Sequence, residues 1–530
     1  MSFATRRLLI RCALTAGLAV LAGCTGPRAT AGTVDIVIAV DGQVQNAAVP
    51  AGSTVQQALD SAGVPLGQFD RVDPPTYTVL SDGARIEVQR VIERFEVETV
   101  VLPYEHQTIR NEALAEGETR LLQPGRNGLQ EVTYRIIEEG DVEISRTPIQ
   151  TVVVEEPVPE IVMVGAQVAR AVLPVDGTLA YLSGGNAWVI RDSSANRRPI
   201  VVSGDLDGRI FRLSRDGEWL VFTRAAEPDT QAINSLWAVS TLADEPELID
   251  LGVENVVHFA DFSPTVPPLT VAYSTVEPSQ AAPGWQANND LLTVTFTPGG
   301  RVTGRRTLIP SNAGGLYGWW GTTFAWATDD LMAYARADSV GLVDLTAPDF
   351  QPLVEVTPLE TFGDWAWVPG IAWGPDNYAL YLVNHGPPVG PESPAASQAF
   401  DLSAIPQGGG PLLSLAPRSG MFAEPVASPG VPLSGGEVSF RVAYLQAVSP
   451  LASADSSYAL MVMDRDGSNQ VPLFPSPGEP GMKPQRVTWS PDAAQLALVY
   501  RGDLWVVDAS TGLAQSLTGD GQVATCDWRR

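Results

Sequence analysis

The chain has few of the residues on which metal sites, disulfides and nucleic-acid binding depend. Its 530 residues include three cysteines and three histidines, and 33 basic residues stand against 60 acidic ones, a net charge of −27. This charge argues against nucleic acid as a partner, because phosphate binding needs clustered Lys and Arg. Three cysteines cannot form a disulfide framework. His106, His258 and His385 lie far apart in the chain, which argues against a three-histidine zinc site.

The sequence also lacks the common catalytic signatures. It contains no G-x-S-x-G, no H-E-x-x-H, no P-loop and no Rossmann glycine pattern. We therefore expect a protein that is not an enzyme, with no cofactor and no metal. Zinc at His106 and calcium at Asp464 and Asp466 are the alternatives. A surface histidine and an ordinary turn are favoured, because partner ligands at the required spacing are missing.

No apolar run is long enough for a membrane-spanning helix, which needs about 20 residues. Leu8 to Ala22 is apolar apart from Arg11, Cys12 and Thr15, and it follows two arginines, which is a signal-peptide pattern. Leu21-Ala22-Gly23-Cys24 resembles the lipobox of bacterial lipoproteins. The resemblance implies that residues 1–23 are removed and that Cys24 carries acyl chains such as palmitate. The mature chain, beginning with a linker at 24–32, would then be held at the extracytoplasmic face of the cell membrane. The alternative is an ordinary signal peptide, in which Cys24 is not lipidated.

Residues 33–90 combine a hairpin, a short helix and a strand. "TVDIVIAVDGQVQNAAVP" predicts two strands around Asp41-Gly42. In "GSTVQQALDSAGV", Ser53 with Gln56 predicts a capping box, and Gly63 predicts the end of the helix. This order, with "DRVDPP" at 70–75, resembles the ubiquitin-like module that often precedes G5 domains in bacterial surface proteins.

Residues 91–167 resemble a G5 domain, a slender all-β module named for five glycines. The matching positions are Gly117, Gly125, Gly128, Gly140 and Gly165. Thin sheets turn tightly, and glycine enters positive φ without cost, so we expect these glycines to serve the turns. G5 domains occur in adhesins, wall-anchored proteases and resuscitation-promoting factors. The resemblance therefore implies either binding to wall glycan or a role as a spacer.

Residues 168–530 contain a repeat of two strands around a polar turn. Examples are "FRLSRDGEWLVFT" (211–223), "AWGPDNYALYLV" (372–383) and "VTWSPDAAQLALVY" (487–500). Third and fourth strands follow each copy, and an aromatic residue or leucine recurs at intervals near 50 residues or twice that. Four-stranded units with this period predict a seven-bladed β-propeller, and "WSPD" resembles TolB-like and WD40-like propellers. The expected fold class is thus mainly β: a ubiquitin-like α+β module, a G5 domain and a propeller.

The first blade lacks one strand, and two segments compete to supply it. "VARAVLP" (168–174) and "VATCDW" (523–528) both have the right pattern, and the second matches the repeat better. Closing the ring with the C-terminal strand removes exposed edges. We therefore expect Cys526 in a closing strand, half-buried and unreactive.

Aromatic residues gather in connections that should emerge on one face of the propeller. The long second-to-third loops are 225–234, 275–289, 385–399 and 446–457, and "YGWW" (317–320) and "DWAW" (364–367) precede two first strands. Aromatic rings with polar neighbours suit a sugar or an extended peptide. The predicted ligand-binding residues are Trp285, Trp320, Trp365, Asp364, Asn288 and Asn289. Trp319 and Trp367 are equally suited to wedging between blades.

These patterns together predict a cell-envelope binding or scaffold protein. Its stalk would associate with peptidoglycan or another glycan, and its propeller would present a face to a ligand or to envelope proteins. The alternative is a propeller-type hydrolase or lyase acting on glycan. Carboxylates converging at the propeller centre would favour that alternative.

Overall fold

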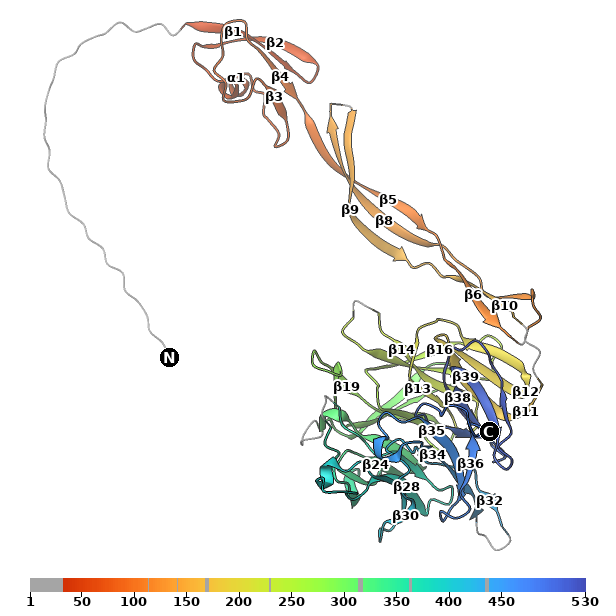
Figure 1. Ribbon diagram of the computed structural model, residues 1–530. Coiled ribbons are helices and arrows are strands. Elements are labelled where there is room, and N and C mark those ends of the chain that lie inside the picture. Colours follow the sequence, from red (N-terminus) through yellow and green to blue (C-terminus); the bar gives the residue numbers. More distant parts are fainter. Residues whose placement is uncertain are drawn as a thin grey trace, which may run out of the picture. The chain divides into compact units, whose positions relative to one another are not determined.

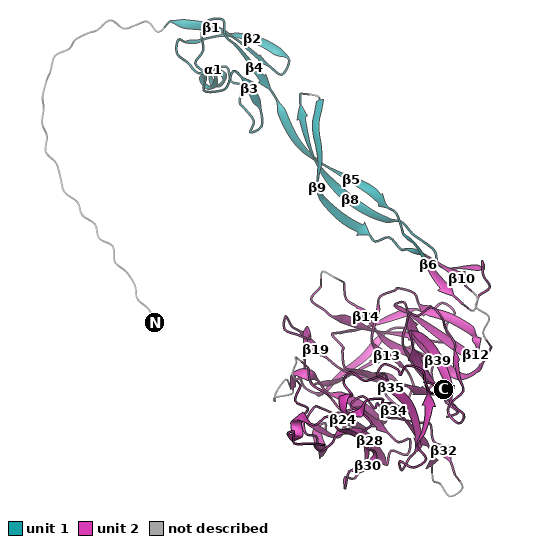
Figure 2. Ribbon diagram, viewed as in Figure 1, with its two compact units in different colours: residues 1–107, 123–160 teal, residues 108–122, 161–530 magenta. Residues whose placement is uncertain are grey.

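A computed structural model describes residues 32–112, 114–140, 142–166, 171–227, 230–312, 318–361, 365–433 and 438–530. The lipidation site predicted at Cys24 lies outside these residues. The chain divides into two compact units, one formed by residues up to 107 with 123–160, the other by 108–122 with 161–530 (Figure 2). In the described part of the chain, no helix has the length and apolar character needed to span a bilayer. The expected mainly-β fold class is confirmed.

The first region is a four-stranded sheet with one helix against it (Figure 1). Its elements are β1 (Thr33–Val40), β2 (Gln43–Pro50), α1 (Val55–Ser61), β3 (Arg71–Asp73) and β4 (Arg85–Gln89). The sheet order is β2-β1-β4-β3, with β1 and β4 parallel. Val55, Ala58 and Leu59 of α1 are buried against sheet residues such as Ile38 and Ile86. This is the expected ubiquitin-like arrangement.

The helix cap lies one residue later than predicted. Thr54 accepts a hydrogen bond from the Gln57 backbone N–H, and the Gln57 side chain accepts one from the Thr54 N–H, so the capping box is Thr54 with Gln57. The prediction of Ser53 with Gln56 was wrong, because the Ser53 hydroxyl donates to the Pro50 carbonyl instead (2.7 Å). Gly63, at φ +70°, follows the helix end as expected.

The second region consists of two three-stranded sheets. The first contains β5 (Val91–Leu102), β8 (Gly128–Glu139) and β9 (Val142–Glu155), in the order β5-β8-β9. The second contains β6 (His106–Asn111), β7 (Thr119–Gln123) and β10 (Glu160–Gly165), in the order β6-β10-β7. Nearly all of β9 is exposed, and Val132 and Ile136 of the central strand are buried. The first sheet is therefore thin, with a very small core.

The five predicted glycines serve two different purposes. Gly117 and Gly140 have positive φ (+85° and +64°), as expected for turns. Gly125, Gly128 and Gly165 do not. At these three positions an added Cβ would meet another group at 2.3, 2.2 and 1.9 Å, from the Tyr104 ring, the Glu155 carbonyl and the Ala115 carbonyl. Turn geometry therefore explains two glycines, and close approach of neighbouring groups explains three.

The described residues from 174 onward form seven sheets of three or four strands, which follow one another along the chain as propeller blades, and two small two-stranded sheets, β19 (Val276–Pro278) with β20 (Trp285–Ala287) and β32 (Val431–Pro432) with β33 (Val438–Ser439). Blade one is β12 (Asn186–Val201), β11 (Pro174–Ser183) and β41 (Val523–Arg529). Blade two is β13 (Leu206–Leu213), β14 (Trp219–Ala225), β15 (Asn234–Ser240) and β16 (Leu248–Glu254). Blade three is β17 (Phe259–Phe262), β18 (Leu269–Ser274), β21 (Leu291–Phe296) and β22 (Val302–Ile309), with the hairpin β19 (Val276–Pro278) and β20 (Trp285–Ala287).

The remaining four blades repeat this pattern. Blade four is β23 (Thr323–Thr328), β24 (Leu331–Ala335), β25 (Ser339–Asp344) and β26 (Phe350–Glu355), preceded by the 3-10 turn η1 (Gly318–Trp320). Blade five is β27 (Ile371–Trp373), β28 (Ala379–His385), β29 (Phe400–Pro406) and β30 (Leu413–Ala416). Blade six is β31 (Val426–Ala427), β34 (Arg441–Ala447), β35 (Tyr458–Asp464) and β36 (Val471–Phe474). Blade seven is β37 (Thr488–Trp489), β38 (Gln495–Tyr500), β39 (Asp503–Asp508) and β40 (Ala514–Ser516).

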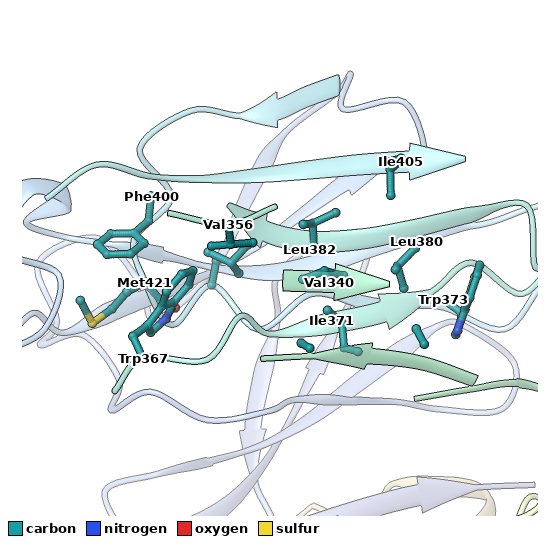
Figure 3. Close-up of a cluster of buried hydrophobic side chains, with 14 of the residues drawn as sticks. Val340, Val356, Trp367, Ile371, Trp373, Leu380, Leu382, Phe400, Ile405 and Met421 are labelled. Carbon is teal, nitrogen blue, oxygen red and sulfur yellow. The ribbon is translucent and has the colours of Figure 1, made fainter. Parts of the chain in front are cut away.

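The first strand of a blade is its inner strand. It contacts the first strands of neighbouring blades, as β13 does with β41 and β17, and β31 with β27 and β37. Apolar clusters fill the spaces between successive blades, and Figure 3 shows the one between blades four and five, with Val340, Trp367, Ile371 and Phe400. Trp373 also donates its indole N–H to the Ala325 carbonyl of the preceding blade (3.2 Å), and Trp489 donates to Val426 in the same way (3.0 Å). The recurring aromatic residues thus join neighbouring blades.

The C-terminal strand closes the ring, as predicted. β41 pairs with β11, with Cys526 opposite Tyr181. Cys526 is buried rather than half-buried, because it belongs to the apolar cluster between blades seven and one. Burial raises the pKa of its thiol to about 12. Blade one has three strands in place of the expected four, because residues 186–201 form one long strand.

The second sheet of the 91–167 region packs against the propeller. Ile109, Leu114, Leu122 and Met163 contact the same apolar cluster as Cys526 and Trp528. The buried Asn111 donates to the Arg197 carbonyl of blade one (3.4 Å). This sheet is therefore part of the propeller's compact unit.

Candidate functional site

The predicted aromatic site lies mainly where blades three and four meet. Trp285 begins β20 and is half-buried, with its ring edge-on to the His258 ring at a centroid distance of 4.5 Å. The half-buried Trp320 belongs to η1, and η1 contacts β20. The structure thus brings Trp285 and Trp320 to adjoining elements, with His258 beside them.

His258 is the least expected member of this group. Its Nε2 is buried and has no hydrogen-bond partner within the described residues, and burial lowers the pKa of the ring to about 4. The imidazole is therefore neutral at neutral pH. Gly321, at φ +98°, directly follows η1, and an added Cβ there would lie 2.6 Å from His258 Nε2. Only glycine lets the chain pass this close to the ring.

The two predicted asparagines support this site from within the protein. Asn289 is buried, with its amide nitrogen donating to the carbonyl oxygens of Gly318 (2.6 Å) and Asn312 (3.1 Å) and its amide oxygen accepting from Thr322 (2.8 Å). Asn288 donates to Thr275 (2.8 Å) and accepts from Ser311 (3.2 Å). These bonds hold residues 311–312, η1 and Thr322 against blade three.

The other predicted residues lie in the segment leading into blade five. Trp365 is 39% exposed, and Asp364 lies outside the described residues. Trp367 is buried, donates its indole N–H to the Met421 carbonyl (2.9 Å) and packs against Phe400. For Trp367, the prediction that it packs between blades is therefore confirmed. Trp319 is half-buried, and its indole nitrogen has no partner in the described part of the chain.

A second group of polar residues, which the sequence reasoning missed, lies on or beside the inner strands. We call it the inner charged ring: Arg212, Asp261, Glu424, Arg486, Asp527 and Arg529. The aligned repeats carry a signal for it. Arg212, Asp261 and Asp527 directly precede the recurring Leu213, Phe262 and Trp528, where blades four and five have Ala325 and Ala372.

Asp527 is the anchored carboxylate of this ring. It accepts from the backbone N–H groups of Leu213 (2.9 Å) and Trp528 (3.1 Å) and from the Thr488 hydroxyl (3.3 Å). Arg529 lies 3.5 Å from it, and this charge raises the pKa of the Arg529 guanidinium. Asp527 thus ties together the inner strands of blades one, two and seven.

Asp261, Glu424 and Arg486 interact electrostatically with other charges of the ring and form no direct ion pair within the described residues. Burial raises the pKa of Asp261 and of Glu424, against the opposing effect of nearby arginines. The pKa of Arg486 is lowered to about 10, first by desolvation and then by the charges of Arg212 and Arg529. The ring therefore contains ionisable groups held away from their ordinary pKa values, which is typical of functional sites.

No metal centre emerges from the described residues. They contain no group of three or more His, Cys, Asp and Glu side chains placed to hold a metal ion. His106 accepts or donates one hydrogen bond with Glu160 (2.8 Å). Asp464 and Asp466 accept hydrogen bonds from Ser468 and Asn469 in their own turn.

Comparison with known proteins assigns the two regions before the propeller. Residues 36–76 match the model of the G5-linked ubiquitin-like domain, and residues 93–167 match the model of the G5 domain. These two segments are a G5-linked ubiquitin-like domain and a G5 domain. Both resemblances seen in the sequence are thus confirmed.

Part of the chain is similar to resuscitation-promoting factor RpfB of Mycolicibacterium smegmatis. The two are 31% identical over 175 residues, which is 32% of this chain and 48% of the relative, so the chain spans about half the length of that relative. Among solved structures, the G5 domain of IgA1 protease is 28% identical and covers 15% of this chain and 94% of its own, with a TM-score of 0.12. The periplasmic gluconolactonase PpgL of Pseudomonas aeruginosa is 11% identical and covers 66% of this chain and 98% of its own, with a TM-score of 0.41.

Proposed function

We propose that the protein is a lipid-anchored binding or scaffold protein of the bacterial cell envelope. The ubiquitin-like and G5 domains form a stalk that associates with wall glycan, and the propeller presents a binding face. The observation that carries this proposal is the pairing of the two stalk domains with a seven-bladed propeller that has Trp285 and Trp320 on adjoining elements. Similarity to a resuscitation-promoting factor supports a place in the envelope.

The aromatic group suits a ligand that stacks on indole rings. Trp285 and Trp320 are half-buried, so each keeps part of its surface available, and the neutral His258 beside them adds no charge. Sugars and extended peptides both use such surfaces, with affinity from ring area and orientation from a few polar groups. This end of the propeller is accordingly where we place the binding face.

Sedimentation with insoluble peptidoglycan tests the proposal. Residues 24–530 with Cys24→Ser would be compared with the same chain carrying Trp285→Ala and Trp320→Ala. Retention of both places wall binding in the stalk, and loss of only the tryptophan variant places it at the aromatic group. If neither form sediments, the glycan association is refuted and the propeller's partner is to be sought among proteins. Labelling cells with radioactive palmitate tests the anchor: the unmodified chain should be labelled and Cys24→Ser should not.

A hydrolase or lyase acting on glycan is the second candidate. The observation that favours it is the presence of two carboxylates with raised pKa, Asp261 and Glu424, in the inner charged ring, since a protonated and an ionised carboxyl together support glycosidic bond cleavage. Incubating the chain with purified wall glycan, and with the Asp261→Asn variant as control, tests it. Release of soluble fragments by the first alone would establish the activity.

A further inference from the structure

The strand β5 is an outer edge of the first G5 sheet. Its 12 residues contain no proline and pair with β8 without a register shift. Gly140 donates to the Arg90 carbonyl (3.1 Å), so the even-numbered residues of β5 bond to β8. The odd-numbered residues from Glu93 to Val101 therefore direct their backbone N–H and C=O groups outward, and in the described part of the chain no hydrogen bond reaches these groups. An edge of this kind is open to another strand.

The opposite edge of the same sheet is protected. Its strand β9 contains Pro148, and three register shifts interrupt its pairing with β8. Proline cannot donate a ladder hydrogen bond, and bulges bend an edge strand away from a flat neighbour. Both features prevent pairing between sheet edges, and β5 has neither of them. The sheet can therefore accept a strand at β5 and not at β9.

Apolar side chains lie exposed along the open edge. Ile92, Phe95, Val97 and Val101 of β5 are each more than half exposed. Because side chains alternate along a strand, Phe95, Val97 and Val101 lie on one face of the sheet. A regular edge strand with exposed apolar residues is a place where strands of two chains pair.

The sequence of β5 is complementary to itself in the antiparallel direction. When two copies are aligned with Glu96 opposite Glu96, Phe95 lies opposite Val97 and Arg94 lies opposite Glu98. Each of these two pairs occurs twice, because the arrangement is two-fold symmetric. Odd-numbered residues then face odd-numbered residues, as an antiparallel ladder requires. Aromatic residues opposite β-branched ones, and opposite charges facing each other, both stabilise antiparallel sheets.

The one unfavourable pair in this alignment is compensated within each copy. Glu96 meets the same residue of the second copy at the two-fold axis. Its carboxylate lies 2.7 Å from the guanidinium of Arg94 and 3.5 Å from that of Arg146. Two cations beside each carboxylate offset the repulsion between the two glutamates.

We propose that two copies of this chain associate through β5 and form one continuous antiparallel sheet in the order β9-β8-β5-β5-β8-β9. Arg94 of each copy pairs with Glu98 of the other, and Phe95 packs against Val97. The protected β9 strands end the sheet on both sides, so association stops at the dimer. The contact consists of backbone hydrogen bonds and side-chain pairs and needs no metal ion. It does not depend on the function proposed for the propeller or on wall binding by the stalk.

Sedimentation equilibrium of residues 24–530 with Cys24→Ser tests the proposal. The chain should be a dimer, with or without EDTA. Arg94→Glu and Glu98→Arg each place like charges opposite one another twice, so each should weaken the dimer about tenfold or more. An equimolar mixture of these two variants should restore it, because every glutamate then faces an arginine. Glu155→Arg, which reverses a charge on β9, is the matched control and should leave the dimer unchanged.

A chain that is monomeric at about 100 µM would overturn the proposal, because a dimer with a Kd in the micromolar range is nearly complete at that concentration. Loss of the dimer in EDTA, or a mixture no more dimeric than the single variants, would also overturn it. Equal weakening by Glu98→Arg and Glu155→Arg would move the contact away from β5.

Val97→Pro is the second variant, for use if the charge variants fail to fold. The N–H that it removes points outward, so the bonds to β8 remain while the dimer should be lost. Hydrogen exchange then locates the contact, since the amides of Phe95, Val97 and Thr99 should exchange more slowly in the dimer than in the Val97→Pro monomer. Protection of these amides only after peptidoglycan is added would assign the edge to a different ligand and overturn the proposal.

Discussion

Arg197 lies 3.7 Å from Glu112, with the two side chains 7% and 14% exposed. Arg197 belongs to blade one, and Glu112 directly follows β6 of the G5 domain. The same guanidinium donates to the Leu517 carbonyl of blade seven. One buried arginine therefore connects the second sheet of the G5 domain with both blades at the closure of the ring.

Replacement of Arg197 should destabilise the propeller strongly. Arg197→Ala removes the ion pair with Glu112 and the hydrogen bond to the Leu517 carbonyl, and removing one member of a buried pair usually costs about 3–5 kcal/mol. All 13 tryptophans lie in the propeller, from Trp188 onward, so denaturation followed by tryptophan fluorescence reports on that domain. Arg120→Ala, which breaks the exposed pair with Glu118 in the same small sheet, is the control and should cost less than about 1 kcal/mol. Equal effects of the two substitutions would contradict the role given to Arg197.

The two kinds of G5 glycine should respond differently to alanine. Gly140 has open space around its Cα, so Gly140→Ala costs only the left-handed backbone conformation, about 1–2 kcal/mol. Gly128→Ala places a methyl group 2.2 Å from the Glu155 carbonyl, so β8 and the end of β9 must separate. Scanning calorimetry of the whole chain should show the larger loss of stability for Gly128→Ala. The reverse order would show that backbone conformation matters more than close approach.

Much of this architecture can be predicted from local sequence. Strands that alternate around polar turns, with Trp373 and Trp489 at matching places, predict blades because each pattern repeats within about 50 residues. The C-terminal "VATCDW", with Trp528 in the place of Trp489, likewise predicted ring closure by β41, which the pairing with β11 confirms. The exact residue that caps a helix is harder to predict. Ser53 and Thr54 are each followed by Gln three residues later, and only the contact of Ser53 with Pro50 decides between them.

The candidate sites depend on contacts that the sequence does not display. His258 faces Gly321 and Trp285 because a hairpin insertion in blade three meets η1 before blade four. Arg486 and Arg212 are more than 250 residues apart and come together only when the ring closes. The sequence signal for the inner charged ring is a charged residue at the same position of several repeats, directly before the recurring aromatic residue or leucine.

His258 should make the propeller less stable in mild acid. Its pKa is about 4 in the folded protein and about 6.5 when unfolded, so the unfolded state binds the proton more readily between these values. Stability from this residue is complete above about pH 6.5 and falls as the pH is lowered toward 4. Between pH 7.5 and 5 the loss should be about 2 kcal/mol. Urea denaturation at both pH values, with His258→Gln as control, measures it: the variant should lose about 2 kcal/mol less than the original chain. The same pH dependence in both would show that other groups are responsible.

Cys526 should be unreactive in the folded protein and reactive after unfolding. The thiolate is the form that attacks alkylating reagents, and burial raises the pKa of this thiol to about 12, so the thiolate is scarce at neutral pH. The side chain also lies in the cluster that closes the ring, where reagents cannot reach it without opening blade one. In residues 24–530 with Cys24→Ser, Cys526 is the one remaining cysteine. Iodoacetamide at pH 8 should leave the native chain unmodified, as followed by mass spectrometry, and add one adduct in denaturant.

Arg197→Ala should speed labelling of the native chain, because the reaction then reports how often the closing strand β41 separates from β11. Rapid labelling of the folded original chain would mean that β41 is not held as the structure describes.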